Sequence, residues 1–194
     1  VVTRRQRQMC IRDRIKTSAV AVDRQMINAP AVVISHQDEL KRLFERGELD
    51  RDCVIVARFQ GPAANGMPEL HQLMPILGVL QDRGHAVALV TDGRLSGASG
   101  KVPAAIHVTP EASKGGAIGR LRVGDLIEMN VATGALRVLL EDDALAAREQ
   151  VAAPASPTTV GRGLFAFNRQ VVTDAEHGGC TLFDASALVD ETTR

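Results

Sequence analysis

Residues 86–101 read AVALVTDGRLSGASGK, in which an apolar run passes directly into a loop that contains three glycines. A short, uninterrupted apolar run of this kind is typical of a strand buried on both faces. Clustered glycines indicate backbone angles that other residues avoid, or a close approach of the backbone to a ligand. A buried strand followed by such a loop is the part of an α/β domain where ligands collect.

Further apolar runs predict the other strands of such a domain. Residues 31–34 (AVVI) and 53–57 (CVIVA) fit short strands. The second is apolar throughout, so we expect it to be central, with Cys53 in the core. Residues 125–130 and 135–140 are joined by a short turn that contains glycine, which predicts a hairpin.

Amphipathic segments between the strands predict helices, as in a mixed α/β domain. Ser35 is expected to cap a helix whose apolar positions share one face until Gly47. A second helix is expected to begin near Pro68, which puts Glu69 in its first turn, and to end at Gly84. Shorter helices are expected at residues 141–150 and 164–172.

Composition bounds the size and the partners of the protein. The 194 residues are 45% hydrophobic, which suffices for one sizeable core. Lys and Arg number 23, as do Asp and Glu, so the net charge is zero and argues against nucleic acid as a partner. No apolar run approaches the roughly 20 residues that cross a bilayer, and no secretory signal is found. We therefore expect a soluble, cytoplasmic protein.

The first fourteen residues differ in composition from the rest. Residues 1–14 (VVTRRQRQMCIRDR) carry five arginines, one acid and no apolar periodicity. A transit peptide or a twin-arginine signal would need an apolar segment that does not follow here. We interpret this stretch as a non-native, arginine-rich leader that resembles translated adaptor sequence, and we assign one domain to residues 15–194.

The cysteines and aromatic residues exclude some kinds of site. Cys10, Cys53 and Cys180 lie far apart in the sequence, without a Cys-x-x-Cys pair, and predict neither a disulfide framework nor a zinc site. Trp and Tyr are absent, which leaves little surface for stacking bases or sugars. Polar groups and the backbone are therefore expected to hold whatever ligand binds.

Two loops with glycines carry the polar residues suited to chemistry. The first ends in NGMPEL, where Glu69 is either a metal ligand or a carboxylate that favours a helix start. From the residues alone, the second is either a ligand-binding loop or an ordinary tight turn with solvated groups. Its candidate residues are Thr91, Asp92, Gly93, Arg94, Ser96, Gly97, Ser99 and Lys101.

A Gly-Lys pair after a strand also suggests a nucleotide-binding loop of the pattern G-x-x-x-x-G-K-[ST]. When Gly100 and Lys101 are aligned with that pattern, its first glycine falls on Leu95 and its hydroxyl residue on Val102. The pattern fails at both positions, which argues against a nucleotide-binding loop.

Residues 57–71 (ARFQGPAANGMPELH) and 88–112 (ALVTDGRLSGASGKVPAAIHVTPEA) closely resemble the C-terminal part of the dihydroxy-acid and 6-phosphogluconate dehydratase family. The resemblance runs from Ile15 to the C-terminus, and residues 96–112 look like the 6-phosphogluconate branch. It implies a swivelling β/β/α domain with a barrel-like mixed sheet and flanking helices. It also implies that an N-terminal half, upstream of Ile15, is missing.

The resemblance implies a hydro-lyase reaction, in which 6-phosphogluconate loses water to give 2-dehydro-3-deoxy-6-phosphogluconate in the Entner–Doudoroff pathway. Ser96, which matches the serine of the family's TDGR-x-SG motif, would be the general base that removes the C2 proton. Glu69, which matches the acid of the GMPE motif, would ligate Mg²⁺. A cation is needed because removing a proton beside a carboxylate creates a second negative charge.

An iron–sulfur cluster of the 4Fe-4S type is also implied, as the Lewis acid for the C3 hydroxyl. No cysteine of this chain matches the family's cluster ligands, which lie in the N-terminal region. We therefore expect the chain to be inactive alone and to act with the N-terminal half of the same enzyme, in a homodimer when full length.

Two alternatives remain open. Within the family, a dihydroxy-acid or pentonate dehydratase acts on acids without a phosphate. If the chain is not part of an enzyme, it would be a non-catalytic module that binds a phosphate or an acid. Among other candidates, His107 is expected to be structural, and Lys114, Arg120 and Arg122 either meet the substrate phosphate or form a solvated loop.

Overall fold

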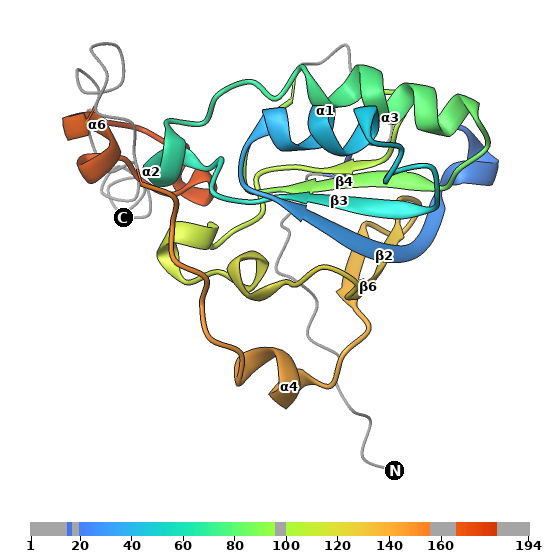
Figure 1. Ribbon diagram of the computed structural model, residues 1–194. Helices are drawn as coiled ribbons and strands as arrows, with labels where there is room; N and C mark the ends of the chain where they lie inside the picture. The colour runs from blue at the N-terminus through green and yellow to red at the C-terminus, as the bar shows by residue number, and fades with distance from the viewer. Residues whose placement is uncertain (1–14, 17–19, 96–99, 156–165, 182–194) are drawn as a thin grey trace, which may run out of the picture.

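The computed structural model describes residues 15–16, 20–95, 100–155 and 166–181, and Figure 1 shows the arrangement of its elements. The strands are β1 (Ile15–Lys16), β2 (Met26–Ile34), β3 (Cys53–Ala57), β4 (Val87–Thr91), β5 (Ala104–Ala105), β6 (Leu126–Asn130) and β7 (Ala135–Val138). The α-helices are α1 (Gln37–Glu45), α2 (Pro62–Asn65), α3 (Leu73–Asp82), α4 (Asp142–Ala146) and α6 (Ala166–Val171). Short 3-10 helices are η1 (Val22–Arg24), η2 (Ala112–Lys114), η3 (Ala117–Arg120) and η4 (Ala175–His177).

In the described part of the chain, seven strands form one mixed sheet in the order β1-β5-β4-β3-β2-β6-β7. β2, β3, β4 and β5 run parallel to one another, whereas β1 pairs antiparallel with β5, and β6 pairs antiparallel with β2 and β7. Every residue of β3 is buried, as expected for a strand between two parallel neighbours. The mixed α/β class, the central position of residues 53–57 and the hairpin of β6 and β7 are therefore confirmed.

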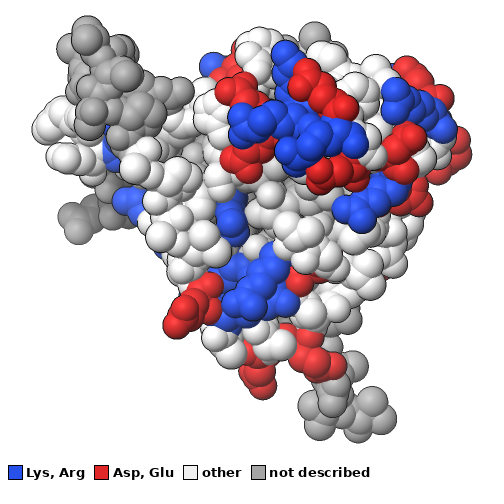
Figure 2. Space-filling model, in the orientation of Figure 1, with Lys and Arg blue, Asp and Glu red and all other residues white. Residues whose placement is uncertain are grey.

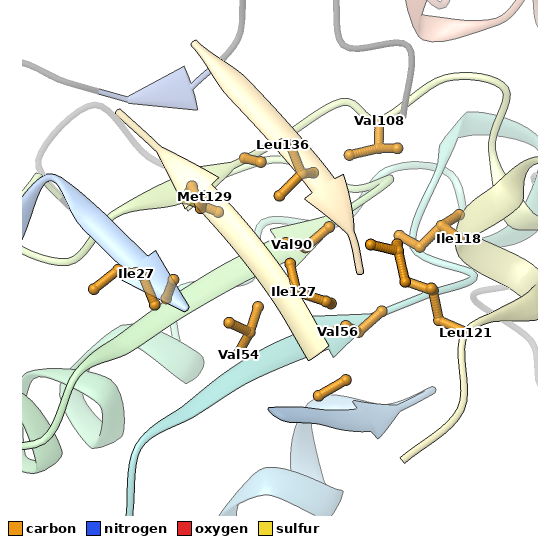
Figure 3. Close-up of a cluster of buried hydrophobic side chains, with 14 of the residues drawn as sticks. Ile27, Val54, Val56, Val90, Val108, Ile118, Leu121, Ile127, Met129 and Leu136 are labelled. Atoms are coloured by element: carbon orange, nitrogen blue, oxygen red, sulfur yellow. The ribbon is translucent and has the colours of Figure 1, made fainter. Parts of the chain in front are cut away.

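Two apolar cores cover the two faces of the sheet. α1 and α3 lie on one face of β2, β3 and β4, whereas β6 and the segments around η2 and η3 lie on the other (Figure 1). Ile55 and Leu89 belong to the helix-side core, and alternate residues such as Val54 and Val56 belong to the other. Figure 3 shows how Ile27, Ile127, Met129, Ile118 and Leu121 meet in that second core. Cys53 has no exposed surface, which confirms its prediction as a core residue.

We expect Leu77→Ala in α3 to lower the free energy of unfolding by about 2–5 kcal/mol. Leu77 is fully buried between α3 and the sheet, and truncation removes apolar contacts and leaves a cavity. The matched control is Val79→Ala on the same helix, because Val79 is 43% exposed. Urea unfolding of both variants measures the difference, and equal losses would contradict this assignment of the helix faces.

Two predicted helix starts are wrong. His36, not Ser35, is the N-cap of α1, because its Nδ1 accepts from the Asp38 N–H at 3.3 Å. The helix expected near Pro68 begins at Leu73, so Glu69 precedes it and does not lie in its first turn. The predicted end of that helix is confirmed, since the Gly84 N–H donates to the Gln81 carbonyl at 3.0 Å.

Candidate functional site at the carboxyl edge of the sheet

The two loops with glycines meet at one edge of the sheet. The parallel strands β3 and β4 end at Ala57 and Thr91, so the loops that follow them leave from the same edge. The first loop continues through α2 to Glu69, and the second begins at Asp92. Loops at the carboxyl ends of parallel strands are the usual place for ligands in such sheets.

Glu69 lies beside the start of the second loop. Glu69 and Arg94 form an isolated parallel β-bridge, and the Leu70 N–H donates to the Arg94 carbonyl at 3.2 Å. The Arg94 side chain turns back, and its Nε donates to the Met67 carbonyl at 2.9 Å. The partly buried Glu69 carboxylate has no hydrogen-bond or ion-pair partner among the residues that the structure describes. Glu69 thus stays a candidate metal ligand, as predicted from the sequence.

Thr91 and Asp92 turn inward, toward the backbone. Thr91 Oγ1 donates to the Ala57 carbonyl at 2.6 Å and accepts from the Gly93 N–H at 2.9 Å. Asp92 has no exposed surface, and its carboxylate accepts three backbone hydrogen bonds at 2.8–3.1 Å, from the N–H groups of Phe59, Gln60 and Ala112. These two side chains tie the ends of β3 and β4 together.

A second buried carboxylate, Glu111, is 2% exposed and caps α2. Its Oε1 accepts from the Ala63 N–H at 3.0 Å, and its Oε2 accepts from the Ala64 N–H at 3.1 Å. Glu111 was not among the candidate residues predicted from the sequence. No local signal marks it, because its partners are 47 and 48 residues away in the chain.

Burial raises the pKa of Asp92 from 3.8 to about 6; the nearby Glu111 adds to the rise, and the three backbone N–H groups oppose it. A carboxyl group whose pKa is higher in the folded than in the unfolded protein stabilises the fold below its unfolded pKa. That contribution is lost as the pH rises through the folded pKa. The ionised form of Asp92 is therefore the less favourable one in the fold.

We expect the contribution of Asp92 to the free energy of unfolding to fall as the pH rises from about 4 to about 6. The loss is on the order of 3 kcal/mol, because one pKa unit corresponds to roughly 1.4 kcal/mol. Urea unfolding across this range, for the unchanged chain and for Asp92→Asn, isolates the effect. Parallel curves for the two proteins would contradict it, and the exposed Asp82→Asn serves as the control.

The structure places the remaining loop residues as follows. The Lys101 ammonium forms an ion pair with Asp82 of α3, and both side chains are largely exposed. Gly93 is buried, as is Gly100, where the described chain resumes. Ser96, Gly97 and Ser99 lie outside the described residues, so their roles stay predictions.

Within the described residues, none of the histidines and none of the other basic residues forms an ion pair or a side-chain hydrogen bond with Glu69. His71 is exposed and precedes α3, and His107, with φ at +56°, donates its backbone N–H to the Gly93 carbonyl at 2.9 Å. Asp125 accepts from the Arg122 backbone N–H and from both terminal nitrogens of Arg148 at 2.5–2.9 Å. Figure 2 shows Lys and Arg side chains among Asp and Glu side chains on the face shown. A phosphate contact by Lys114, Arg120 or Arg122 stays a prediction.

Two hollows lie beside α2. One, of about 410 Å³, is lined by residues of α2, by Met67 and Pro68, and by α6. The other, of about 320 Å³, lies between α2 and the residues that follow β2 and β3. Arg169 lines both. Their volumes fall in the range of small-ligand pockets, and the first adjoins the segment that carries Glu69.

The described residues offer one carboxylate that suits Mg²⁺, but no set of thiolates that suits an iron–sulfur cluster. Mg²⁺ in proteins is commonly held by one or two carboxylates together with water and substrate oxygens, so the unpartnered Glu69 carboxylate fits one position of such a site. Cluster ligation needs several thiolates, but Cys53 is buried and burial raises the pKa of its thiol to about 11. In the described ranges, no group of three or more His, Cys, Asp or Glu is placed to hold a metal ion.

The family profile described as dihydroxy-acid/6-phosphogluconate dehydratase C-terminal matches residues 12–179. The chain belongs to this family. It is 56% identical over 172 residues to phosphogluconate dehydratase of Escherichia coli K12, a match that covers 87% of this chain and 28% of that protein. The Pseudomonas aeruginosa phosphogluconate dehydratase is 54% identical over 172 residues, with 88% of this chain and 28% of that protein covered.

A dihydroxy-acid dehydratase of Campylobacter curvus is more distant, at 33% identity over 166 residues, covering 84% of this chain and 29% of that protein. The family resemblance is thus confirmed, and the chain is more similar to these phosphogluconate dehydratases than to this dihydroxy-acid dehydratase. The chain spans less than a third of the length of these dehydratases. Within the described ranges, no helix has the length and apolar character needed to span a bilayer.

Proposed function

We propose that this chain is the part of a 6-phosphogluconate dehydratase that supplies the base and one metal ligand for loss of water. The higher identity to phosphogluconate dehydratases than to a dihydroxy-acid dehydratase supports the phosphorylated substrate. The observation that carries the proposal is the bridge between Glu69 and Arg94. This bridge brings Glu69, the acid of the family's GMPE motif, next to the segment that leads into Ser96, the serine of the family's TDGR-x-SG motif.

Covalent geometry limits how far the Cα of Ser96, the proposed base, lies from the Cα of Arg94. Ser96 follows Arg94 by two residues, and two residues of extended chain span at most about 7 Å. A base and a cation within one small-ligand site suit the abstraction of a proton next to a carboxylate, where charge develops on the carboxylate oxygens. In this proposal Ser96 takes the C2 proton, and the glycine backbone around it stabilises the anionic oxygen.

Glu69 would hold Mg²⁺, which when bound supplies positive charge for the substrate carboxylate. The other ligands would come from water, from the substrate and from the region upstream of this chain. An iron–sulfur cluster would likewise be held upstream, because the family resemblance places its ligands in the N-terminal region. Loss of the C3 hydroxyl is therefore assigned to that region, and we propose that the two parts act together, as a homodimer in the cytoplasm.

The substrate is tested with the full-length protein. Turnover of 6-phosphogluconate is compared with turnover of gluconate and of a branched dihydroxy acid. We expect kcat/KM to be highest for the phosphorylated acid. Preference for an acid without phosphate would assign the protein to the other branch of the family.

A non-catalytic binding module is the second candidate, and complementation separates it from the enzyme. This chain is mixed with a separately produced upstream region, and loss of water from 6-phosphogluconate is followed. Activity that appears only in the mixture supports the proposal. Binding of the substrate by this chain without restored activity would favour the module.

A further inference from the structure

Two buried carboxylates, Asp92 and Glu111, lie next to the segments that carry the candidate site. Asp92 has no exposed surface and Glu111 has 2%. Within the described residues, neither forms an ion pair with Lys, Arg or His. Five backbone N–H groups donate to them instead, from Phe59, Gln60, Ala63, Ala64 and Ala112.

The donors come from the segments that build the site. The N–H groups of residues 59–64 belong to the loop that runs through α2 to Glu69. Asp92 itself opens the loop that leads to Ser96, and Arg94, two residues later, bridges to Glu69. Ala112 belongs to a third segment, which begins where His107 bonds to Gly93. The hydrogen bonds of these two carboxylates therefore connect all three segments to one another.

Two glycines mark places where these segments approach one another closely. A Cβ at Gly61 would lie 2.2 Å from Oε2 of Glu111. A Cβ at Gly93 would lie 2.7 Å from the Cβ of Gln60 and 3.1 Å from its carbonyl oxygen. The backbone approaches so closely that a side chain at either position would push the loops apart.

Stability alone does not account for this arrangement. The raised pKa of Asp92 means that burying its ionised form is unfavourable. What a carboxylate offers here is two acceptor oxygens, which an amide cannot match because its nitrogen is a donor. At Asp92 the two oxygens serve Phe59, Gln60 and Ala112, so an amide would face at least one of these N–H groups with its own donor.

We propose that Asp92 and Glu111 are positioning residues of the dehydration site, which fix the Glu69 segment against the loop that leads to Ser96 without touching the substrate. This inference rests on the proposed function. It gives Asp92 a different role from the substrate contact that the sequence predicts. Because misplacement by about 1 Å costs roughly 100-fold in rate, loosening these bonds is expected to act on the reaction itself.

The test uses the full-length dehydratase with Asp92→Asn, Glu111→Gln or the control Glu45→Gln, whose carboxylate is exposed on α1. We expect kcat for 6-phosphogluconate to fall by roughly 10- to 100-fold in the first two, with KM within about threefold. We also expect a larger C2-deuterium isotope effect on kcat, or a higher Mg²⁺ concentration for half-maximal activity. A mere loss of folded protein changes neither of these two readouts.

Three results would overturn the inference. The first is unchanged kcat, and the second is lower kcat with both the isotope effect and the Mg²⁺ dependence unaltered. The third is failure of both variants to fold, judged by circular dichroism and thermal melting, since the carboxylates would then support the whole domain. If the unchanged enzyme does not dehydrate 6-phosphogluconate, the proposed function fails instead, and the variants are compared on the acid it does dehydrate.

Discussion

Replacing Ser96 by alanine in the full-length dehydratase is expected to lower kcat for 6-phosphogluconate by about 10²- to 10⁴-fold. Alanine has no oxygen to take the C2 proton, and a positioned general base commonly contributes a factor of this size. KM is expected to change little, because a proton acceptor acts chiefly in the transition state. Steady-state kinetics with metal and iron contents measured in parallel check the result.

The matched control is Ser113→Ala, the same substitution at an exposed serine of η2. It is expected to keep the kinetic constants of the unchanged enzyme. A loss in Ser96→Ala that is accompanied by loss of iron or magnesium would point to a structural role for the serine. Full activity of Ser96→Ala would reject it as the base.

The second large effect is expected for Glu69→Gln. A neutral amide is a poorer ligand for Mg²⁺ than a carboxylate, so the Mg²⁺ concentration for half-maximal activity should rise by at least roughly 10- to 100-fold. The partly buried Glu69 carboxylate has no described partner, so its replacement is not expected to break an existing contact. Activity titrations with Mg²⁺ measure the shift.

Glu45→Gln provides the control for this second experiment, because Glu45 is exposed and, within the described residues, makes only a long ion pair with Lys41 at 3.9 Å. Its Mg²⁺ dependence should match that of the unchanged enzyme. If Glu69→Gln keeps the same Mg²⁺ dependence but loses thermal stability, Glu69 is a structural residue.

The strands were predictable because their signal is local. The runs at Cys53 and Val87 are apolar at every or nearly every position, and burial on both faces follows from that pattern. The helix start near Pro68 was not predictable, since Pro68 and Glu69 resemble a first helical turn. A long-range bridge to Arg94 keeps this stretch extended, and Met67 with φ at +53° redirects the chain before it.

The candidate site was predictable only in part. Glu69 and Ser96 follow from motifs, and the two parallel strands explain why their loops meet. Asp92 was expected to face a ligand, but its neighbours in space come from residues 20, 32 and 33 positions away. Glu111 shows the same limit. A buried carboxylate that caps distant backbone is specified by the tertiary fold and has no signature in the sequence around it.

The central claim is that residue 96 takes the C2 proton beside a cation held at residue 69. The most direct measurement is the uptake of solvent deuterium at C2 of 6-phosphogluconate, followed by NMR in the full-length enzyme and in the Ser96→Ala and Glu69→Gln variants. We expect exchange in the unchanged enzyme, none in Ser96→Ala, and in Glu69→Gln exchange that returns only at high Mg²⁺. Exchange at an undiminished rate in Ser96→Ala would contradict the account.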